Sequence, residues 1–184
     1  MIPFVRARPR SEASRRHPAG VVELGPQDID RAVAMHHRCS THTLWSRYHR
    51  AMGDPRAYLG TLLARPGAVH LAVQRPEGDL VAVGHLMPDR ENAEAALLVE
   101  DAWQNSGLGT RLLRHLGQRA VHAGWKEVYG LVLPGDRKIS AILSHVSIPI
   151  HTVDEEGLTT VWAETADMAA AGLSLVTADA DADA

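Results

Sequence analysis

Two glycines, Gly107 and Gly109, stand between a short apolar run and a stretch with leucines at helical spacing. The apolar run at residues 95–99 predicts a buried strand, and the leucines from Leu108 predict an amphipathic helix that ends at Gly124. The first N–H groups of a helix have no partner inside the helix, and the helix dipole adds positive potential there. Because glycines let a ligand approach the backbone closely, this turn is a candidate phosphate-binding site.

The spacing excludes two common phosphate-binding motifs. No Lys-Ser/Thr pair follows the glycines, as a P-loop requires, and the pattern is not the G-x-G-x-x-G of dinucleotide-binding folds. An ordinary glycine-rich turn between a strand and a helix is the alternative interpretation.

Two glutamates, Glu94 and Glu100, bracket the predicted strand and are candidates for a general base. Alternate residues of a strand face the same side, so both carboxylates are expected on one face. The alternation of strand residues therefore does not show which of the two glutamates is the base.

The elements around these residues alternate between strands and helices over about residues 21–164. A helix is expected from Pro26 through His36, a shorter one capped by Ser40, and turns at residues 76–79, 88–92 and 154–157. Further helices are expected at residues 55–64, 108–123 and 137–145, and strands at residues 21–24, 69–75, 80–87, 93–99, 126–133, 148–153 and 158–163.

Composition indicates one globular domain. The chain has 184 residues, of which 45% are hydrophobic and 22% charged. A net charge of −3 gives no reason to expect a nucleic-acid partner, and no apolar run is long enough for a membrane span. The single Cys39 excludes an internal disulfide, which fits a cytoplasmic protein.

The two ends differ from the middle in charge. Residues 1–18 are rich in arginine and proline and are expected to form a disordered basic arm, and residues 168–184 a flexible acidic tail. The domain is therefore expected at residues 19–167.

The spacing Gln104-x-x-Gly107-x-Gly109 resembles the Q/R-x-x-G-x-G/A motif of the GNAT superfamily of N-acetyltransferases. The resemblance implies an α/β fold, with a mixed, mostly antiparallel sheet flanked by helices. It also implies that acetyl-CoA is the co-substrate, with its pyrophosphate at this turn. The residues expected to bind it are Leu98, Val99, Gln104, Asn105, Ser106, Gly107, Leu108, Gly109, Thr110 and Arg111.

Two segments resemble the bacterial branch that includes protein-lysine acetyltransferases. Residues 93–109 resemble its A-E-F-A-V-x-V-x-D-x-W-Q-G-x-G-L-G stretch, and residues 40–48 resemble its S-x-x-T/S-x-x-x-R-Y/F segment. The helices before residue 65 cover the acceptor side in this family. Trp45, Tyr48 and Tyr58 are therefore expected either to line a substrate cleft or to pack in the core.

Transfer of an acetyl group to an amine needs a base, a donor to the thioester carbonyl, and an acid for the departing thiolate. By resemblance, Glu94 is the base and a backbone N–H near Val99 is the donor, with Glu100 as the rival base. The family's strands carry a bulge here, which weakens the parity argument.

The acid is where the sequence departs from many family members. Residues 137–145 lack the tyrosine often found in this helix, and Asp136 stands where Asn often contacts the cofactor. Ser140, Ser144 and His145 are candidate substitutes. Arg111 and Arg114 suit either a CoA phosphate or a solvated helix face.

No metal site is expected, although the chain has 11 histidines, because neither H-E-x-x-H nor C-x-x-C spacing is present. The sequence thus predicts an acetyl-CoA-dependent N-acetyltransferase. The acceptor would be the amine of a small molecule or a protein, and an oligomer is compatible with the sequence. The alternatives are a GNAT-fold sensor that binds acyl-CoA without catalysis and an unrelated phosphate-binding α/β protein.

Overall fold

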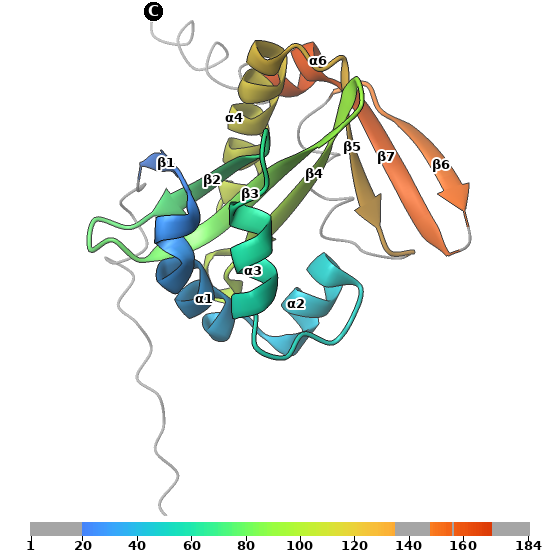
Figure 1. Cartoon of the computed structure of the whole chain (residues 1–184). Helices are drawn as coiled ribbons and strands as arrows, with labels where there is room; N and C mark the ends of the chain where they lie inside the picture. The colour runs from blue at the N-terminus through green and yellow to red at the C-terminus, as the bar shows by residue number, and fades with distance from the viewer. Residues whose placement is uncertain (1–19, 135–147, 156, 171–184) are drawn as a thin grey trace, which may run out of the picture.

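The computed structural model describes residues 20–134, 148–155 and 157–170 (Figure 1). Its strands are β1 (Val21–Glu23), β2 (Val69–Gln74), β3 (Leu80–Asp89), β4 (Asn92–Val99), β5 (Glu127–Val132), β6 (His151–Glu155) and β7 (Leu158–Glu164). Its α-helices are α1 (Ile29–Arg38), α2 (Thr41–Tyr48), α3 (Arg56–Leu63), α4 (Leu108–Ala123) and α6 (Thr165–Ala170). Two 3-10 helices, η2 (Pro26–Asp28) and η3 (Asp101–Trp103), precede α1 and α4. None of the helices in these ranges is long and apolar enough to cross a membrane.

The described strands form one sheet in the order β1-β2-β3-β4-β5-β7-β6. Neighbouring strands are antiparallel except β4 and β5, which are parallel. The expected mixed, mostly antiparallel sheet is therefore confirmed.

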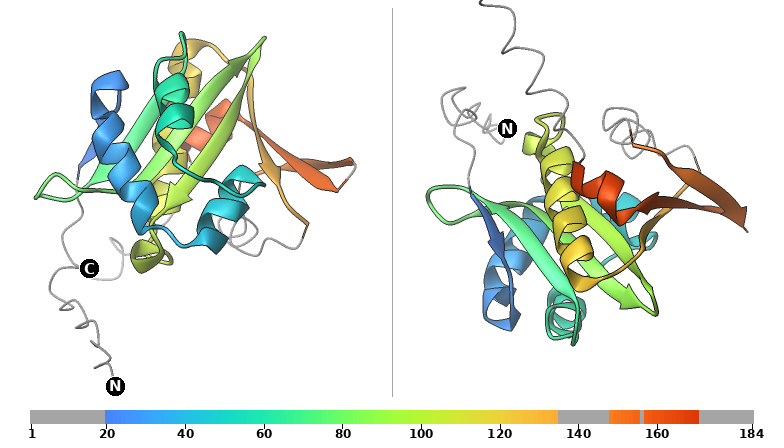
Figure 2. Two further views of the ribbon diagram at one scale, coloured as in Figure 1. Left: turned by 60° about the horizontal axis from the view of Figure 1, so that its bottom comes forward. Right: turned by 90° about the horizontal axis from the view of Figure 1, so that it is seen from above.

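Helices cover both faces of the first four strands (Figure 2). On one face α1 and α3 enclose a core around Met35, Leu59 and Leu80, and on the other α4 and α6 enclose a core around Leu112, Leu116 and Met168. The apolar stripe of α4 thus packs on the sheet, as its leucine spacing predicts.

Pairing of β3 with β4 runs without a break from Ala82–Val99 to Asp89–Asn92. The bulge expected in this strand from the family resemblance is therefore absent, and that expectation was wrong. Because the register is regular, side chains of β4 alternate strictly between the two faces.

Three further differences from the expected elements concern strand ends and an added helix. Strand β3 continues through Pro88 to Asp89, so the turn before β4 is shorter than expected. Helix α6 was not expected; a Cβ on Gly117 of α4 would lie 2.4 Å from the backbone nitrogen of Ala169, so only glycine permits this packing. Strand β6 begins at His151, later than expected. The helix expected at residues 137–145 lies outside the described residues.

Candidate active site

Strands β4 and β5 pair only at Ala93–Val128 and Glu94–Tyr129, and then diverge (Figure 1). A pocket of about 290 Å³ lies at this divergence. Its two sides are lined by residues 94–97 of β4 and residues 128–132 of β5. A third wall is formed by residues 46–50, which are the last residues of α2 and the two that follow it. The widening of the sheet therefore creates a cavity beside the central strand.

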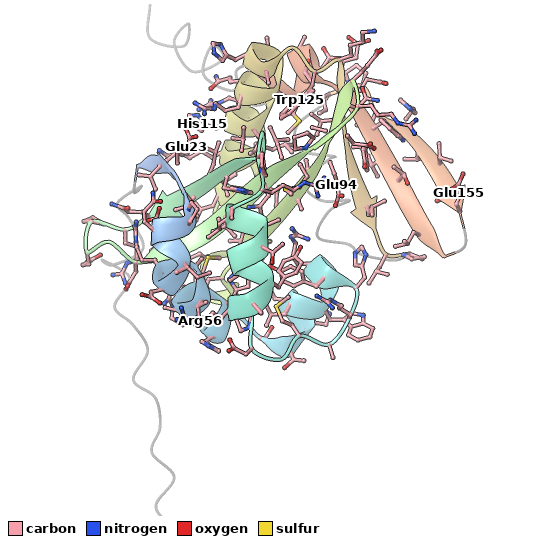
Figure 3. All side chains as sticks on the ribbon, in the orientation of Figure 1. Glu23, Arg56, Glu94, His115, Trp125 and Glu155 are labelled. Atoms are coloured by element: carbon pink, nitrogen blue, oxygen red, sulfur yellow. The ribbon has the colours of Figure 1, made fainter. Side chains whose placement is uncertain are left out.

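Glu94 lies in this pocket, at the point where the strands begin to separate (Figure 3). Its side chain is partly exposed, so the carboxylate can meet a ligand in the cavity. Tyr129, its partner across the parallel pair, donates a hydrogen bond to Asp89 at 3.0 Å. Burial first, and then Asp89 and Glu94, raise the pKa of Tyr129 to about 12.

Glu100 lies elsewhere. It is buried, and its Oε2 accepts a 3.0 Å hydrogen bond from Nε of Arg38 in α1. Arg38 also donates to the carbonyl oxygens of Ala34 and Leu80, which fixes the guanidinium in place. Glu100 is not among the residues that line the pocket. The structure thus separates two glutamates that strand alternation alone left equivalent.

Backbone groups of β4 alternate in direction as its side chains do. The N–H of Glu100 donates to the carbonyl of Val81 in β3 at 3.0 Å. Residues at odd positions therefore direct their N–H groups away from β3, toward the side on which β5 has diverged. By this alternation the N–H of Val99 faces the gap between the strands.

The cradle, which we define as residues 104–110, lies at the N-terminus of α4. Gly107 precedes the helix with φ of 78°, a left-handed conformation that glycine adopts without a steric penalty. No side chain caps the helix here, and no acidic residue lies in its first turn. Asn105, Ser106 and Gly107 are exposed, and Gly109 is buried. The free N–H groups suit a phosphate, although none of these residues lines the pocket.

A cluster of hydrogen bonds holds the cradle against α2. Asp101 accepts bonds from the N–H and Oγ of Ser40, at 2.8 and 2.7 Å, and from Oγ1 of Thr43 at 2.8 Å. The amide of Gln104 donates to Thr43 and to the carbonyl of Val99, each at 3.1 Å. Burial raises the pKa of Asp101, but the bonds from Ser40 and Thr43 outweigh it and hold the value below the usual range.

This cluster explains why serine and threonine stand three positions apart in residues 40–43. Ser40 also caps α2 as expected, since its Oγ accepts a 3.2 Å bond from the N–H of Thr43. The same two side chains that begin the helix therefore also fix the loop after β4.

Several other residues expected to bind acetyl-CoA have side chains that point elsewhere. Leu98 is buried in the core between the sheet and α1 and α3, and the amide of Gln104 is directed at Thr43 and Val99. Ser106 donates from Oγ to the carbonyl of Trp103. These residues can reach a ligand mainly through their backbone. Leu108 and Thr110 lie partly exposed in the first turn of α4.

Arg111 and Arg114 of α4 differ in their surroundings. Arg111 has interactions within the protein, whereas Nε of Arg114 is buried without a hydrogen-bond partner. Both are compatible with an anion near the helix start, which would relieve the unfavourable position of a cation there.

Of the aromatic residues expected at a cleft or in the core, Tyr48 and Tyr58 line the pocket, whereas Trp45 does not. The hydroxyl of Tyr48 lies 2.6 Å from Nε2 of His36, whose Nδ1 lies 2.7 Å from the carbonyl of Ala32. Only a protonated Nδ1 can bond to that carbonyl, and burial lowers the pKa of His36 to about 4, so Nε2 is the acceptor. Tyr48 therefore donates to His36 and keeps its oxygen lone pairs for the pocket.

Several polar residues of the pocket were missed as individual sites in the sequence, among them Arg47, His49, Arg50 and Tyr129. Arg47 belongs to the R-Y pair of the segment at residues 40–48, and that match was the one available signal for it. His49 and Tyr129 carry no motif. No group of His, Cys, Asp and Glu within the described ranges could hold a metal ion.

Comparison of sequences finds no matching family model, and no curated protein matches the chain. Comparison of structures does find matches, and they have the GNAT acetyltransferase fold. The GNAT domain of PAT from S. lividans is similar with a TM-score of 0.71 and 21% identity, covering 78% of this chain and 89% of that one.

Two enzymes of known type share the fold at lower identity. Spermidine N-acetyltransferase from Vibrio cholerae, in complex with CoA and spermine, has a TM-score of 0.64 and 10% identity, with 81% and 96% coverage of the two chains. The ribosomal-protein alanine N-acetyltransferase from Escherichia coli has a TM-score of 0.61 and 13% identity, with 79% and 93% coverage. The chain thus has the GNAT fold over most of its length.

Proposed function

We propose that this protein is an N-acetyltransferase that uses acetyl-CoA and transfers the acetyl group directly to a primary amine. One observation carries the proposal: β4 and β5 separate directly after Glu94, and the pocket formed there contains a partly exposed carboxylate. The separation gives a long, thin co-substrate a path between the strands, and the uncapped start of α4 gives its phosphates a place to bind.

Acetyl-CoA supplies an activated acetyl thioester. The nitrogen lone pair of the amine attacks the carbonyl carbon, a C–N bond forms, and the C–S bond breaks to release the thiolate of CoA. The attacking amine must be deprotonated, and Glu94 accepts its proton directly or through a water molecule.

The carbonyl oxygen gains negative charge during attack, and a fixed N–H donor lowers the energy of that state. The N–H of Val99 is the proposed donor, because strand alternation directs it into the gap rather than toward β3. Departure of the thiolate also needs a proton donor. Tyr48 and Tyr129 both lie in the pocket, but each donates its proton to another residue.

The solved structures with this fold include enzymes that act on a polyamine and on a ribosomal-protein alanine, which supports an amine as the acceptor class. The complex of one of them with CoA supports a CoA thioester as the donor. The competing proposal is a GNAT-fold module that binds acyl-CoA without catalysis.

Two measurements on the full chain test the proposal. The first is calorimetric binding of acetyl-CoA, with ATP and NAD as competitors. The second is release of free CoA thiol with a panel of amino acids, small amines and lysine peptides. We expect acetyl-CoA to bind in preference to the nucleotides and at least one amine to release thiol. Binding without any thiol release would favour the sensor, and preference for ATP or NAD would overturn both proposals.

A further inference from the structure

The wall of the pocket contributed by α2 and the residue after it contains two buried nitrogen atoms without a partner. Nε of Arg47 and Nε2 of His49 are each buried and make no hydrogen bond. A buried polar group without a partner destabilises the fold, so such groups are uncommon unless a ligand completes them. Both atoms belong to side chains that line the same cavity as Glu94.

Charge at this wall is positive. Arg47 and the more exposed Arg50 supply this charge, and His49 lies between them in the chain. No carboxylate among the described residues forms a salt bridge with any of the three. The guanidinium of Arg47 lies 4.7 Å from the centre of the Tyr48 ring, and that of Arg50 lies 5.6 Å from the Tyr58 ring. The aromatic rings orient the two cations without neutralising them.

The C-terminal position of Arg47 in α2 suits the negative end of the helix dipole, which explains a cation there. It does not explain why a guanidinium nitrogen is desolvated with no acceptor. His49 adds an independent observation, because it adopts a left-handed backbone with φ of 54°, uncommon for a residue with a side chain. This conformation ends the helix and leaves the imidazole at the pocket wall.

We propose that the acceptor is a small amine that also carries a carboxylate, such as an amino acid, and that Arg47 and His49 bind this carboxylate. A carboxylate accepts hydrogen bonds from both nitrogen atoms and neutralises the arginine. The amino group of the same molecule is then held in the cavity that contains Glu94. Tyr48, whose proton is committed to His36, accepts a hydrogen bond from that amino group.

The same wall disfavours the other acceptor classes. A polyamine or a lysine-rich peptide would bring further positive charge against Arg47 and Arg50, and like charges at short range repel. The charge of the wall therefore selects against polycations. This inference rests on the proposed acetyl transfer for its chemistry, but the binding of the carboxylate can be measured without turnover.

The test compares amino acids with the amines formed by removing their carboxyl group, for example phenylalanine with phenethylamine. For the preferred side chain we expect kcat/KM to be about 10- to 100-fold higher when the carboxylate is present. Arg47→Gln should raise the KM of the amino acid by a similar factor while its kcat stays nearly the same. The kcat/KM of the matched amine, which has no carboxylate, should also change little. Arg47→Lys should recover part of the loss.

Arg56→Gln is the matched control, because Arg56 forms an exposed ion pair with Asp30 and does not line the pocket (Figure 3). Equal or better activity with the decarboxylated amines or with spermidine would overturn the proposal. So would an Arg47→Gln variant that loses activity equally on both members of a pair, since that indicates a structural role.

A second arm separates this proposal from the acetyltransferase proposal. Ligand-observed NMR with the CoA-bound protein measures binding of the same amino acids and amines. If no amine releases thiol but an amino acid binds and loses binding in Arg47→Gln, the carboxylate subsite stands and the transferase proposal fails. If no amino acid binds, the subsite proposal is overturned whatever the thiol assay shows.

Discussion

The side-chain amide of Gln104 donates to Oγ1 of Thr43 at 3.1 Å, and this bond joins two segments 61 positions apart in the chain. Thr43 in turn donates to Asp101, which also accepts both bonds from Ser40. The turn before α4 is therefore fixed to the start of α2, the helix that contributes to the wall of the pocket. Through this contact the proposed phosphate site and the proposed acceptor site share one support.

Asp101→Ala should lower stability, because three donors lose their acceptor. We expect a loss of about 1–3 kcal/mol in the free energy of unfolding, measured by urea titration. Affinity for acetyl-CoA should also fall, since the cradle loses its anchor. Asp30→Ala is the control, because the Asp30–Arg56 pair is exposed and such pairs contribute little.

The pKa of Asp101 is held below its usual range, so its contribution to stability is present above about pH 4 and is lost as the pH falls through the lowered value.

Wild-type affinity for acetyl-CoA in Asp101→Ala would show that the hydrogen bonds of Asp101 do not support the cradle.

Glu94→Gln should lower turnover about 10²- to 10⁴-fold with little change in acetyl-CoA affinity. The substitution keeps the shape of the side chain and removes its ability to accept a proton. The loss should shrink at high pH, where more of the amine is already deprotonated. The thiol-release assay across pH, with calorimetry for binding, measures both effects.

Glu100→Gln is the matched variant and should behave differently. Turnover should stay near normal, while the free energy of unfolding falls by about 1.5–3 kcal/mol, because Arg38 loses its charged partner. If Glu100→Gln loses turnover and Glu94→Gln stays near normal, Glu100 is the base and Glu94 is not. Near-normal turnover in both would mean that the amine arrives deprotonated and needs no side-chain base.

Gly109→Val should weaken acetyl-CoA binding by obstructing close approach to the start of α4. Circular dichroism and thermal unfolding must show that the variant is folded, since Gly109 is buried. Gly60→Val tests the general effect of valine in place of a helical glycine, because nothing lies within 4 Å of a Cβ there. Unchanged affinity in a folded Gly109→Val would remove the phosphate site from the cradle.

Stability should fall in mild acid because three histidines are held neutral by the fold. The pKa of His36 is lowered to about 4, and the pKa values of His70 and His85 are lowered as well. Burial is the largest cause in each case. The last two also meet through their Nδ1 atoms at 2.9 Å, a bond that requires at least one of those atoms to be unprotonated.

Above about pH 6.5 these residues are neutral in the folded and unfolded chain, so they add no pH dependence. Below it the unfolded chain binds protons that the folded chain excludes, and each histidine lowers stability by up to about 1.4 kcal/mol per pH unit. Urea unfolding at several pH values from neutral to mildly acidic measures the slope. A flat profile would contradict the prediction.

Local patterns in the sequence were sufficient for most of the described elements, and the motif resemblance added the type of fold. The leucine spacing of α4, the serine before α2 and the turn residues around each strand act between neighbours in the chain, and each gave an element close to its observed place. The turn at the cradle could also be predicted, because a strand, two glycines and a helix follow one another directly in the sequence. Local physics did not predict α6, which depends on the contact of Ala169 with Gly117.

Strand alternation alone did not decide which glutamate faces the pocket; the resemblance favoured Glu94, and the tertiary structure places Glu94 at the pocket. Glu94 and Glu100 share a strand face, and their difference arises from partners far along the chain: Arg38 neutralises Glu100, whereas the divergence of β5 opens a cavity at Glu94. The unpartnered nitrogen atoms of Arg47 and His49 could not be inferred from the sequence, because burial without a partner is a property of the packed molecule. Sequence patterns report interactions between near neighbours, whereas the shape and the lining of this pocket depend on contacts between distant ones.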